Sequence, residues 1–210
     1  PSTNHSKNRT QRIRSSLFLC PQPRLQAGNR KGQFMSQPLW VFGYGSLIWD
    51  PGFPVAEAQV ARLSDWHRSF CMRSIHHRGT PERMGLVLAL DRAAGAFCDG
   101  VAFRVAEGAE AETLAALRAR ELISSASLED WLPVRTRDGR DVTALTYVID
   151  PCHEQYCGGL SLTEQAGIIA QAVGGRGTNR AYLEATAAHL ADLGIADADL
   201  DALVIMVQGL

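Results

Sequence analysis

Lysine is nearly absent from this chain of 210 residues, and both copies, Lys7 and Lys31, lie near its beginning. Residues 36–210 contain none. A Schiff-base nucleophile and the lysine of a phosphate-binding loop both require this side chain. We therefore exclude both chemistries from that part of the protein.

Long apolar runs are also missing, since none approaches the roughly 18 residues that a membrane-spanning helix needs. Apolar residues make up 46% of the chain and charged residues 20%, which is ordinary for a globular protein. A chain of this length can bury one full hydrophobic core. We expect one folded domain without a membrane partner.

The five cysteines have no paired spacing, and a chain of this size does not need disulfides for stability. We interpret them as reduced thiols and expect a cytoplasmic protein. His76 and His77 are adjacent, so on an extended segment they would point to opposite sides. Cys152-His153 with Cys157 lacks a second ligand pair elsewhere. Surface or turn roles are therefore favoured over a metal site.

Charge is distributed unevenly along the chain. Residues 1–35 carry seven of the 21 Lys and Arg and no acidic residue, which leaves 14 basic against all 22 acidic residues in 36–210. The resulting net charge of −8 argues against a nucleic-acid partner. Residues 1–35 are too polar to fold alone, so we expect a disordered basic extension before a domain over 36–210.

This basic leader resembles an organelle transit peptide, and its short apolar patch weakly resembles a signal sequence. We favour a third interpretation. Met35 directly precedes the first expected strand and looks like a natural start. The preceding residues would then be an upstream extension without catalytic function.

Residues 40–49, Trp-Val-Phe-Gly-Tyr-Gly-Ser-Leu-Ile-Trp, combine a short apolar strand with a glycine-rich turn. Such a turn presents consecutive backbone N–H groups, which can bind an anion or a developing oxyanion. A tight turn between two core segments is the alternative. Ile48 stands where a dinucleotide fingerprint needs its third glycine, and Ser46 is not in a nucleophile elbow.

The rest of the pattern predicts an α+β fold with a mainly antiparallel or mixed sheet, because strands come first and alternate poorly with helices. We expect a polar loop over residues 75–81 and a turn over 91–96. Expected strands lie within 57–73 and over 84–90 and 97–105, with a hairpin over 131–137 and 142–149. Expected helices are 106–122, 161–173, 178–193 and 199–207.

Two charged residues are candidates for chemistry. Glu121 ends an apolar helix between leucine and isoleucine, where burial would raise its pKa and make it a better base near neutral pH. The alternative is a solvated carboxylate paired with Arg118 or Arg120. Arg78, in a glycine-containing loop, could form a bidentate ion pair with a carboxylate, or could be a surface arginine.

Together these motifs resemble the ChaC family of glutathione-specific γ-glutamylcyclotransferases. The most specific match is residues 42–49, Phe-Gly-Tyr-Gly-Ser-Leu-Ile-Trp. It is supported in order by residues 77–81, Gly100-Val-Ala-Phe103, Arg120-Glu121, the 156–159 turn, and the Gly177, Asn179, Tyr182 and Leu183 pattern. The resemblance covers roughly residues 39–190.

The resemblance implies a mixed, barrel-like β-sheet with packed helices, the γ-glutamylcyclotransferase-like fold. It also implies cleavage of glutathione to 5-oxoproline and Cys-Gly without cofactor or metal. Glu121 maps to the catalytic glutamate, and Tyr44, Gly45, Ser46 and Leu47 map to the motif that binds the γ-glutamyl group. Other γ-glutamyl amines or amino acids as substrates, or a non-catalytic γ-glutamyl-binding module, remain alternatives, and no oligomeric state is predicted.

Overall fold

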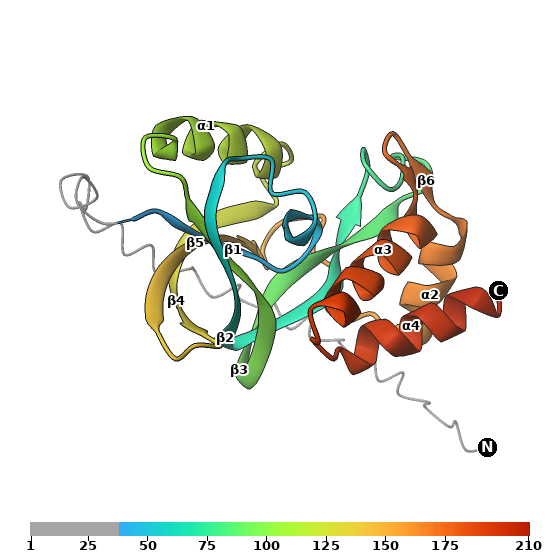
Figure 1. Ribbon diagram of the computed structural model, residues 1–210. Helices are drawn as coiled ribbons and strands as arrows, with labels where there is room; N and C mark the ends of the chain where they lie inside the picture. Colours follow the sequence, from blue (N-terminus) through green and yellow to red (C-terminus); the bar gives the residue numbers. More distant parts are fainter. Residues whose placement is uncertain (1–37) are drawn as a thin grey trace, which may run out of the picture.

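The computed structural model describes residues 38–210, and the extension expected over residues 1–35 lies outside that range. The strands form a closed barrel on one side of the molecule, and three of the four helices pack together on the other side (Figure 1). Helix α1 (Glu110–Glu121) covers the barrel itself (Figure 1). The α+β fold with a barrel-like sheet and packed helices is therefore confirmed.

The barrel has the strand order β1-β3-β2-β4-β5. Its strands are β1 (Trp40–Gly43), β2 (Val55–Ser74), β3 (Gly85–Val105), β4 (Ser127–Thr136) and β5 (Asp141–Ile149). All neighbours pair antiparallel except β1 and β5, which are parallel and close the barrel. The sheet is thus mixed, as predicted.

The turn expected over residues 91–96 is wrong, because β3 continues through it as a strand of 21 residues. Ser64 pairs with Phe97 and Trp66 with Arg92, so several residues of β3 oppose one residue of β2. The backbone N–H of Gly95 donates to Asp65 Oδ1 at 2.9 Å. The turn-like composition marks a bulge, which bends a strand pair without ending it.

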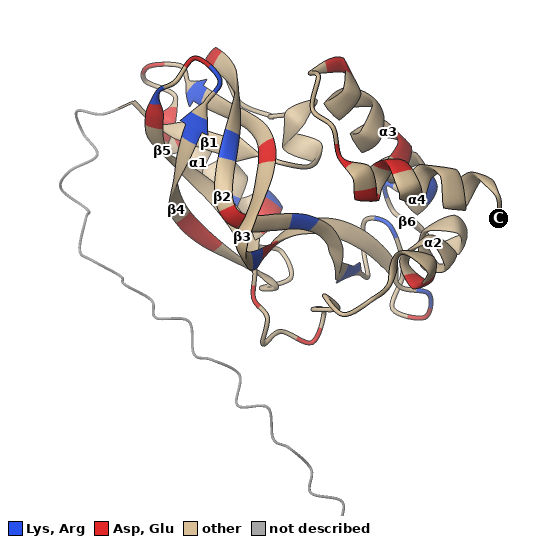
Figure 2. Cartoon of the chain, turned by 90° about the horizontal axis from the view of Figure 1, so that it is seen from below, with Lys and Arg blue, Asp and Glu red and all other residues tan. Residues whose placement is uncertain are grey.

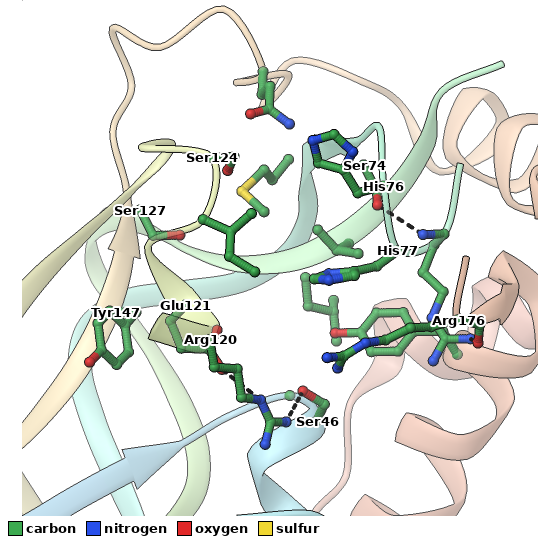
Figure 3. A pocket seen from close by; sticks show the side chains of 18 of the residues that line it. Ser46, Ser74, His76, His77, Arg120, Glu121, Ser124, Ser127, Tyr147 and Arg176 are labelled. Carbon is green, nitrogen blue, oxygen red and sulfur yellow. Dashed lines mark hydrogen bonds and ion pairs between the residues drawn. The ribbon is translucent and has the colours of Figure 1, made fainter. Parts of the chain in front are cut away.

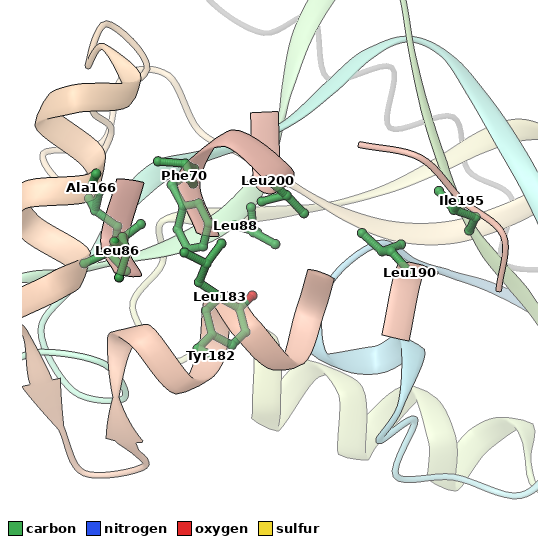
Figure 4. Packing of buried hydrophobic residues seen from close by; sticks show 12 residues of the cluster. Phe70, Leu86, Leu88, Ala166, Tyr182, Leu183, Leu190, Ile195 and Leu200 are labelled. Atoms are coloured by element: carbon green, nitrogen blue, oxygen red, sulfur yellow. The ribbon is translucent and has the colours of Figure 1, made fainter. Parts of the chain in front are cut away.

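This bend divides the β2–β3 ribbon between two environments. The half formed by residues 55–64 of β2 and 97–105 of β3 belongs to the barrel. The other half carries Phe70, Leu86 and Leu88, which form a buried cluster with residues of the helices (Figure 4). The helices of that cluster are α2 (Leu162–Gln171), α3 (Asn179–Asp192) and α4 (Ala198–Gln208).

The three packed helices begin at side-chain caps, which satisfy backbone N–H groups of their first turns. Ser161 and Glu164 form a reciprocal capping box on α2, Thr178 accepts from Ala181 N, and Asp197 accepts from Leu200 N.

Acidic residues gather near the start of α4, while acidic and basic residues mix over the barrel strands (Figure 2). No helix in residues 38–210 has the length and apolar character to cross a membrane.

Asn179 joins helix α3 to the ribbon. Its buried side chain donates to the Leu86 carbonyl at 2.7 Å and accepts from the Leu86 N–H at 2.6 Å. A side-chain amide thus takes the place of a neighbouring strand at the edge of β3 opposite β2. This bonding explains why an asparagine follows the glycine-rich linker between α2 and α3.

Three of the cysteines, Cys71, Cys98 and Cys157, are free thiols, as expected. Cys152 is disulfide-bonded, so the interpretation of all five cysteines as reduced thiols is wrong at that position.

Candidate functional site

A cavity of about 150 Å³ opens where the barrel meets the helical layer. Among the segments that line it are the turn after β1, the end of α1, the loop over residues 75–78, and the turn between β6 (Val173–Gly174) and β7 (Gly177–Thr178). Figure 3 shows Glu121, Arg120, Ser46, His77 and Arg176 around its centre. These segments lie far apart in the sequence, and folding brings them together.

Close packing of neighbouring atoms favours glycine at two positions of the turn after β1. A Cβ at Gly43 would lie 2.9 Å from Leu47 Cβ, and one at Gly45 would lie 3.2 Å from Tyr182 Oη. Carbonyls of the turn accept from the N–H groups of Ile48 and Trp49, which wind the short helix η1 (Ser46–Ile48).

The N–H groups at the start of this turn are available to a ligand. Within residues 38–210 the backbone N–H groups of Gly45, Ser46 and Leu47 donate no hydrogen bond. All three residues line the cavity. The concavity of N–H groups expected from the sequence can therefore form at this turn.

The side chains of Tyr44 and Leu47 serve the fold. The Tyr44 hydroxyl donates to the Tyr147 carbonyl at 2.8 Å, and burial together with the nearby Glu121 raises its pKa well above the ordinary value. Leu47 is buried in a hydrophobic cluster beneath α1. Both residues also line the cavity.

Glu121 is the last residue of α1, and its side chain is 26% exposed. Arg120 Nε lies 3.2 Å from Glu121 Oε1, while Arg120 Nη2 donates to Ser46 Oγ at 3.0 Å. Arg120 Nη1 also donates to the Asp50 carbonyl at 2.8 Å. One guanidinium therefore ties the carboxylate to the glycine-rich turn (Figure 3).

The electrostatic surroundings suit Glu121 to proton transfer. Burial raises the pKa of its carboxyl above the usual value, and the positive charges of Arg120 and Arg176 oppose that shift. The other partner considered from the sequence, Arg118, is engaged elsewhere, donating to Glu129 at 2.7 and 2.8 Å. A carboxylate with a raised pKa is a better base near neutral pH than an ordinary surface glutamate.

Arg78 lines the cavity, and its guanidinium is anchored to the β6–β7 turn. Its Nη1 donates to the carbonyls of Arg176 and Thr178 at 2.6 and 3.3 Å. Its Cζ lies 5.2 Å from the centre of the Tyr182 ring. Arg78 therefore organises the rim, and its role as a carboxylate ligand stays a prediction.

Sequence reasoning missed Arg176, an arginine in the glycine-rich linker before α3. It lines the cavity, and within residues 38–210 its guanidinium forms no hydrogen bond or ion pair. The linker Gly-Gly-Arg-Gly indicates only a helix break. Its distance in sequence from the other site residues hid its place in the cavity.

The loop over residues 75–78 docks onto the same turn. The N–H groups of Gly175 and Arg176 donate to the carbonyls of His76 and His77 at 2.8 and 2.9 Å. The polar loop expected here is confirmed, its residues 75–78 form bends, and both histidines line the cavity. Burial and nearby Arg176 lower the pKa of His77, which keeps its imidazole neutral near pH 7.

The described residues contain no group of three or more His, Cys, Asp or Glu that could hold a metal ion. Their arrangement supplies three other chemical functions. Glu121 can move a proton, the glycine-rich turn can stabilise negative charge on oxygen, and Arg176 can bind a carboxylate. These are the requirements of a reaction at a carbonyl of an anionic substrate.

Comparison with known proteins gives consistent results. A family model described as ChaC-like protein matches residues 39–210. The glutathione-specific γ-glutamylcyclotransferase of Escherichia coli (strain K12) is 38% identical over 82% of this chain and 74% of its own length. The γ-glutamylcyclotransferase 2-1 of Arabidopsis thaliana is 39% identical over 69% of this chain and 70% of its own.

A solved structure shares the fold. It is a yeast γ-glutamyl cyclotransferase specific to glutathione, with a TM-score of 0.75 and 22% sequence identity. The match covers 82% of this chain and 96% of that one. The barrel and its helical layer are therefore a known architecture.

Proposed function

Because the chain belongs to the ChaC-like family, we propose that it is a γ-glutamylcyclotransferase that cleaves glutathione to 5-oxoproline and cysteinylglycine. The observation that carries this proposal is the position of Glu121, which Arg120 holds beside the glycine-rich turn. The relatives from Escherichia coli and Danio rerio are named for activity on glutathione. We place this lyase-type reaction in the cytoplasm.

The reaction is an intramolecular substitution. The α-amine of the γ-glutamyl group attacks its own γ-carbonyl carbon, which forms the C–N bond of a five-membered ring. The amide C–N bond to cysteine then breaks, and cysteinylglycine leaves. Holding the flexible substrate in a ring-closing conformation can contribute roughly 7–11 kcal/mol toward the barrier.

Glu121 handles the protons of this exchange. The substrate amine is an ammonium at neutral pH, so a base must remove a proton before it can attack. The Glu121 carboxylate accepts that proton, and the attacking nitrogen loses a second proton as it becomes the ring amide. The departing nitrogen of cysteinylglycine gains two protons, one from the Glu121 carboxyl as the C–N bond breaks and one as it leaves as an ammonium. Two protons thus pass from the attacking to the departing nitrogen, and the enzyme ends in its starting state.

The glycine-rich turn handles the negative charge. Attack converts the γ-carbonyl oxygen to an oxyanion, and the N–H groups of Gly45, Ser46 and Leu47 are the donors available to it. Glutathione also carries two carboxylates. We assign one of these carboxylates to Arg176. The hydrogen bond from Arg78 to the Arg176 carbonyl supports this assignment, because it holds the backbone of Arg176 in place beside the cavity.

The substrate assignment is tested by comparing glutathione with γ-glutamyl-alanine while 5-oxoproline is measured. We expect kcat/KM to be higher for glutathione, because Ser124, Gln155 and Met72 also line the cavity and would contact cysteinylglycine. Equal or higher turnover of γ-glutamyl-alanine would favour the alternative of a broader γ-glutamyl substrate. Tight binding of both without 5-oxoproline would favour a binding module.

Arg176→Ala is expected to raise the KM for glutathione by about tenfold, since a hydrogen bond to a charged group contributes about 1.5–3 kcal/mol. The same change removes a positive charge that lowers the pKa of Glu121. The acid limb of kcat/KM should therefore move to higher pH. Arg83→Ala, which removes an exposed arginine bound to Gln171, is the matched control. An unmoved acid limb and an unchanged KM would contradict the role of Arg176.

A further inference from the structure

Arg68 is a buried arginine of β2 that lies behind the glycine-rich turn, and its side chain is only 3% exposed. Its Nε and Nη2 donate to Asp197 Oδ2 at 3.0 and 2.5 Å. Its Nη1 donates to the carbonyl oxygens of Asp99 and Tyr44 at 2.9 and 3.2 Å. The guanidinium therefore joins β2, β3, the start of α4 and the turn after β1.

The bond to the Tyr44 carbonyl determines the direction of an N–H group. The described residues contain no cis peptide bond. In a planar trans peptide, the carbonyl of Tyr44 and the N–H of Gly45 point in opposite directions. Since the carbonyl points toward Arg68, the N–H points away from Arg68, and Gly45 lines the cavity whereas Arg68 does not.

Tyr44 is held at its other end as well. Its hydroxyl donates to the Tyr147 carbonyl of β5 at 2.8 Å. With the phenol bound to one strand and the carbonyl bound to an arginine of another, the peptide plane between Tyr44 and Gly45 has little freedom to rotate. A donor fixed before the reaction stabilises an oxyanion without reorganising.

We propose that Arg68 is a positioning residue that orients the Gly45 N–H toward the oxyanion formed during cyclisation. This inference rests on the proposed cyclotransferase function. Arg68 does not touch the substrate. It acts through the peptide plane, and Asp197 holds it in place from the first turn of α4.

The chemistry of the site requires an arginine. A guanidinium carries five N–H donors in a rigid plane and can bind one carboxylate and two carbonyls at once. A lysine offers a single ammonium on a flexible stem and cannot span these partners in the same geometry. Loss of one oxyanion donor typically lowers kcat by about 10²–10³-fold, so a donor that is present but misdirected should cost less.

The test compares Arg68→Lys with Arg62→Lys. Arg62 lies on the same strand, forms a two-pronged ion pair with the Asp99 side chain, and is 50% exposed. We expect Arg68→Lys to lower kcat by about 10–100-fold per folded molecule, with KM for glutathione changed by less than about threefold. Arg62→Lys should retain both constants. Circular dichroism supplies the folded fraction.

A second variant removes the guanidinium without leaving a buried charge unpaired. Arg68→Met combined with Asp197→Asn neutralises both partners, and asparagine still caps α4. This protein should fold even if Arg68→Lys does not, and it should show the same selective loss of kcat. Asp197→Asn alone keeps the arginine, so its kcat should fall less than that of the double variant.

The outcomes separate the two proposals. If the wild type releases 5-oxoproline and either folded Arg68 variant keeps the native kcat, the positioning role is overturned and the cyclotransferase function stands. An equal loss of kcat in Arg62→Lys also overturns it, because any arginine of β2 would then have the same effect. A wild type that releases no 5-oxoproline from glutathione overturns the proposed function itself.

Discussion

Glu121→Gln should lower the release of 5-oxoproline from glutathione by about 10²–10⁴-fold, the usual contribution of a general acid or base. The amide has nearly the same shape as the carboxyl, but it cannot accept the proton of the substrate ammonium. Arg120 and Ser46 would still hold the turn, so KM should change little. Steady-state kinetics with direct detection of 5-oxoproline measures both constants.

The same variant should fold at least as well as the wild type. Burial raises the pKa of Glu121, which means that the folded protein disfavours its charged form. A neutral amide avoids that cost, although it loses the ion pair with Arg120. Glu112→Gln, an exposed change in the first turn of the same helix, is the control and should remain fully active. Native turnover by Glu121→Gln would show that another group is the base.

Gly79→Ala should destabilise the protein by about 3 kcal/mol, the upper part of the usual range for overpacking. A Cβ at this position would lie 2.0 Å from Gly85 N, 2.5 Å from the Ser74 carbonyl oxygen and 2.8 Å from the Arg83 carbonyl oxygen. All three are backbone atoms, so the conflict cannot be relieved by a side-chain rotation. Thermal or urea unfolding measures the change.

The shift should also reach the cavity. Gly174 packs equally closely, since a Cβ there would lie 2.4 Å from Gly79 N and 2.6 Å from Arg78 N. Moving the loop therefore displaces Arg78 and the turn that carries Arg176, and KM should rise. Gly167→Ala makes the same substitution inside α2 with no atom within 4 Å, and should stabilise by about 0.5–1 kcal/mol. Equal stability of the two alanine variants would contradict this account of the loop.

Much of the fold follows from local patterns. Alternating and continuous apolar runs predicted the strands, and Ala-rich segments predicted the helices. The hairpin expected over residues 131–137 and 142–149 is confirmed as the antiparallel pair β4 and β5. The error over residues 91–96 has a physical cause. A bulge and a turn use the same small and polar residues, and only pairing with β2 tells them apart.

The residues of the site also differ in how far the sequence reveals them. Local sequence indicated the glycine-rich turn, by its two glycines after an apolar strand, and Glu121, by its place at the end of an apolar helix. The prediction that they act together came from the family resemblance, and the structure brings them together through Arg120. Arg68 and Arg176 carry no local signal, because arginines are common in strands and loops. Their roles depend on partners that lie far away in the chain.

The sequence by itself thus determined which chemistries are excluded, the α+β class and the two segments at the centre of the site. Those properties depend on residue type and on near neighbours. Only the tertiary structure decided which arginines serve the cavity, because burial and a pair of distant carbonyls turn Arg68 into a support, while Arg176 is left facing a cavity. Such contacts follow from the closing of the barrel and the packing of α2–α4 against it, and no short stretch of sequence encodes them.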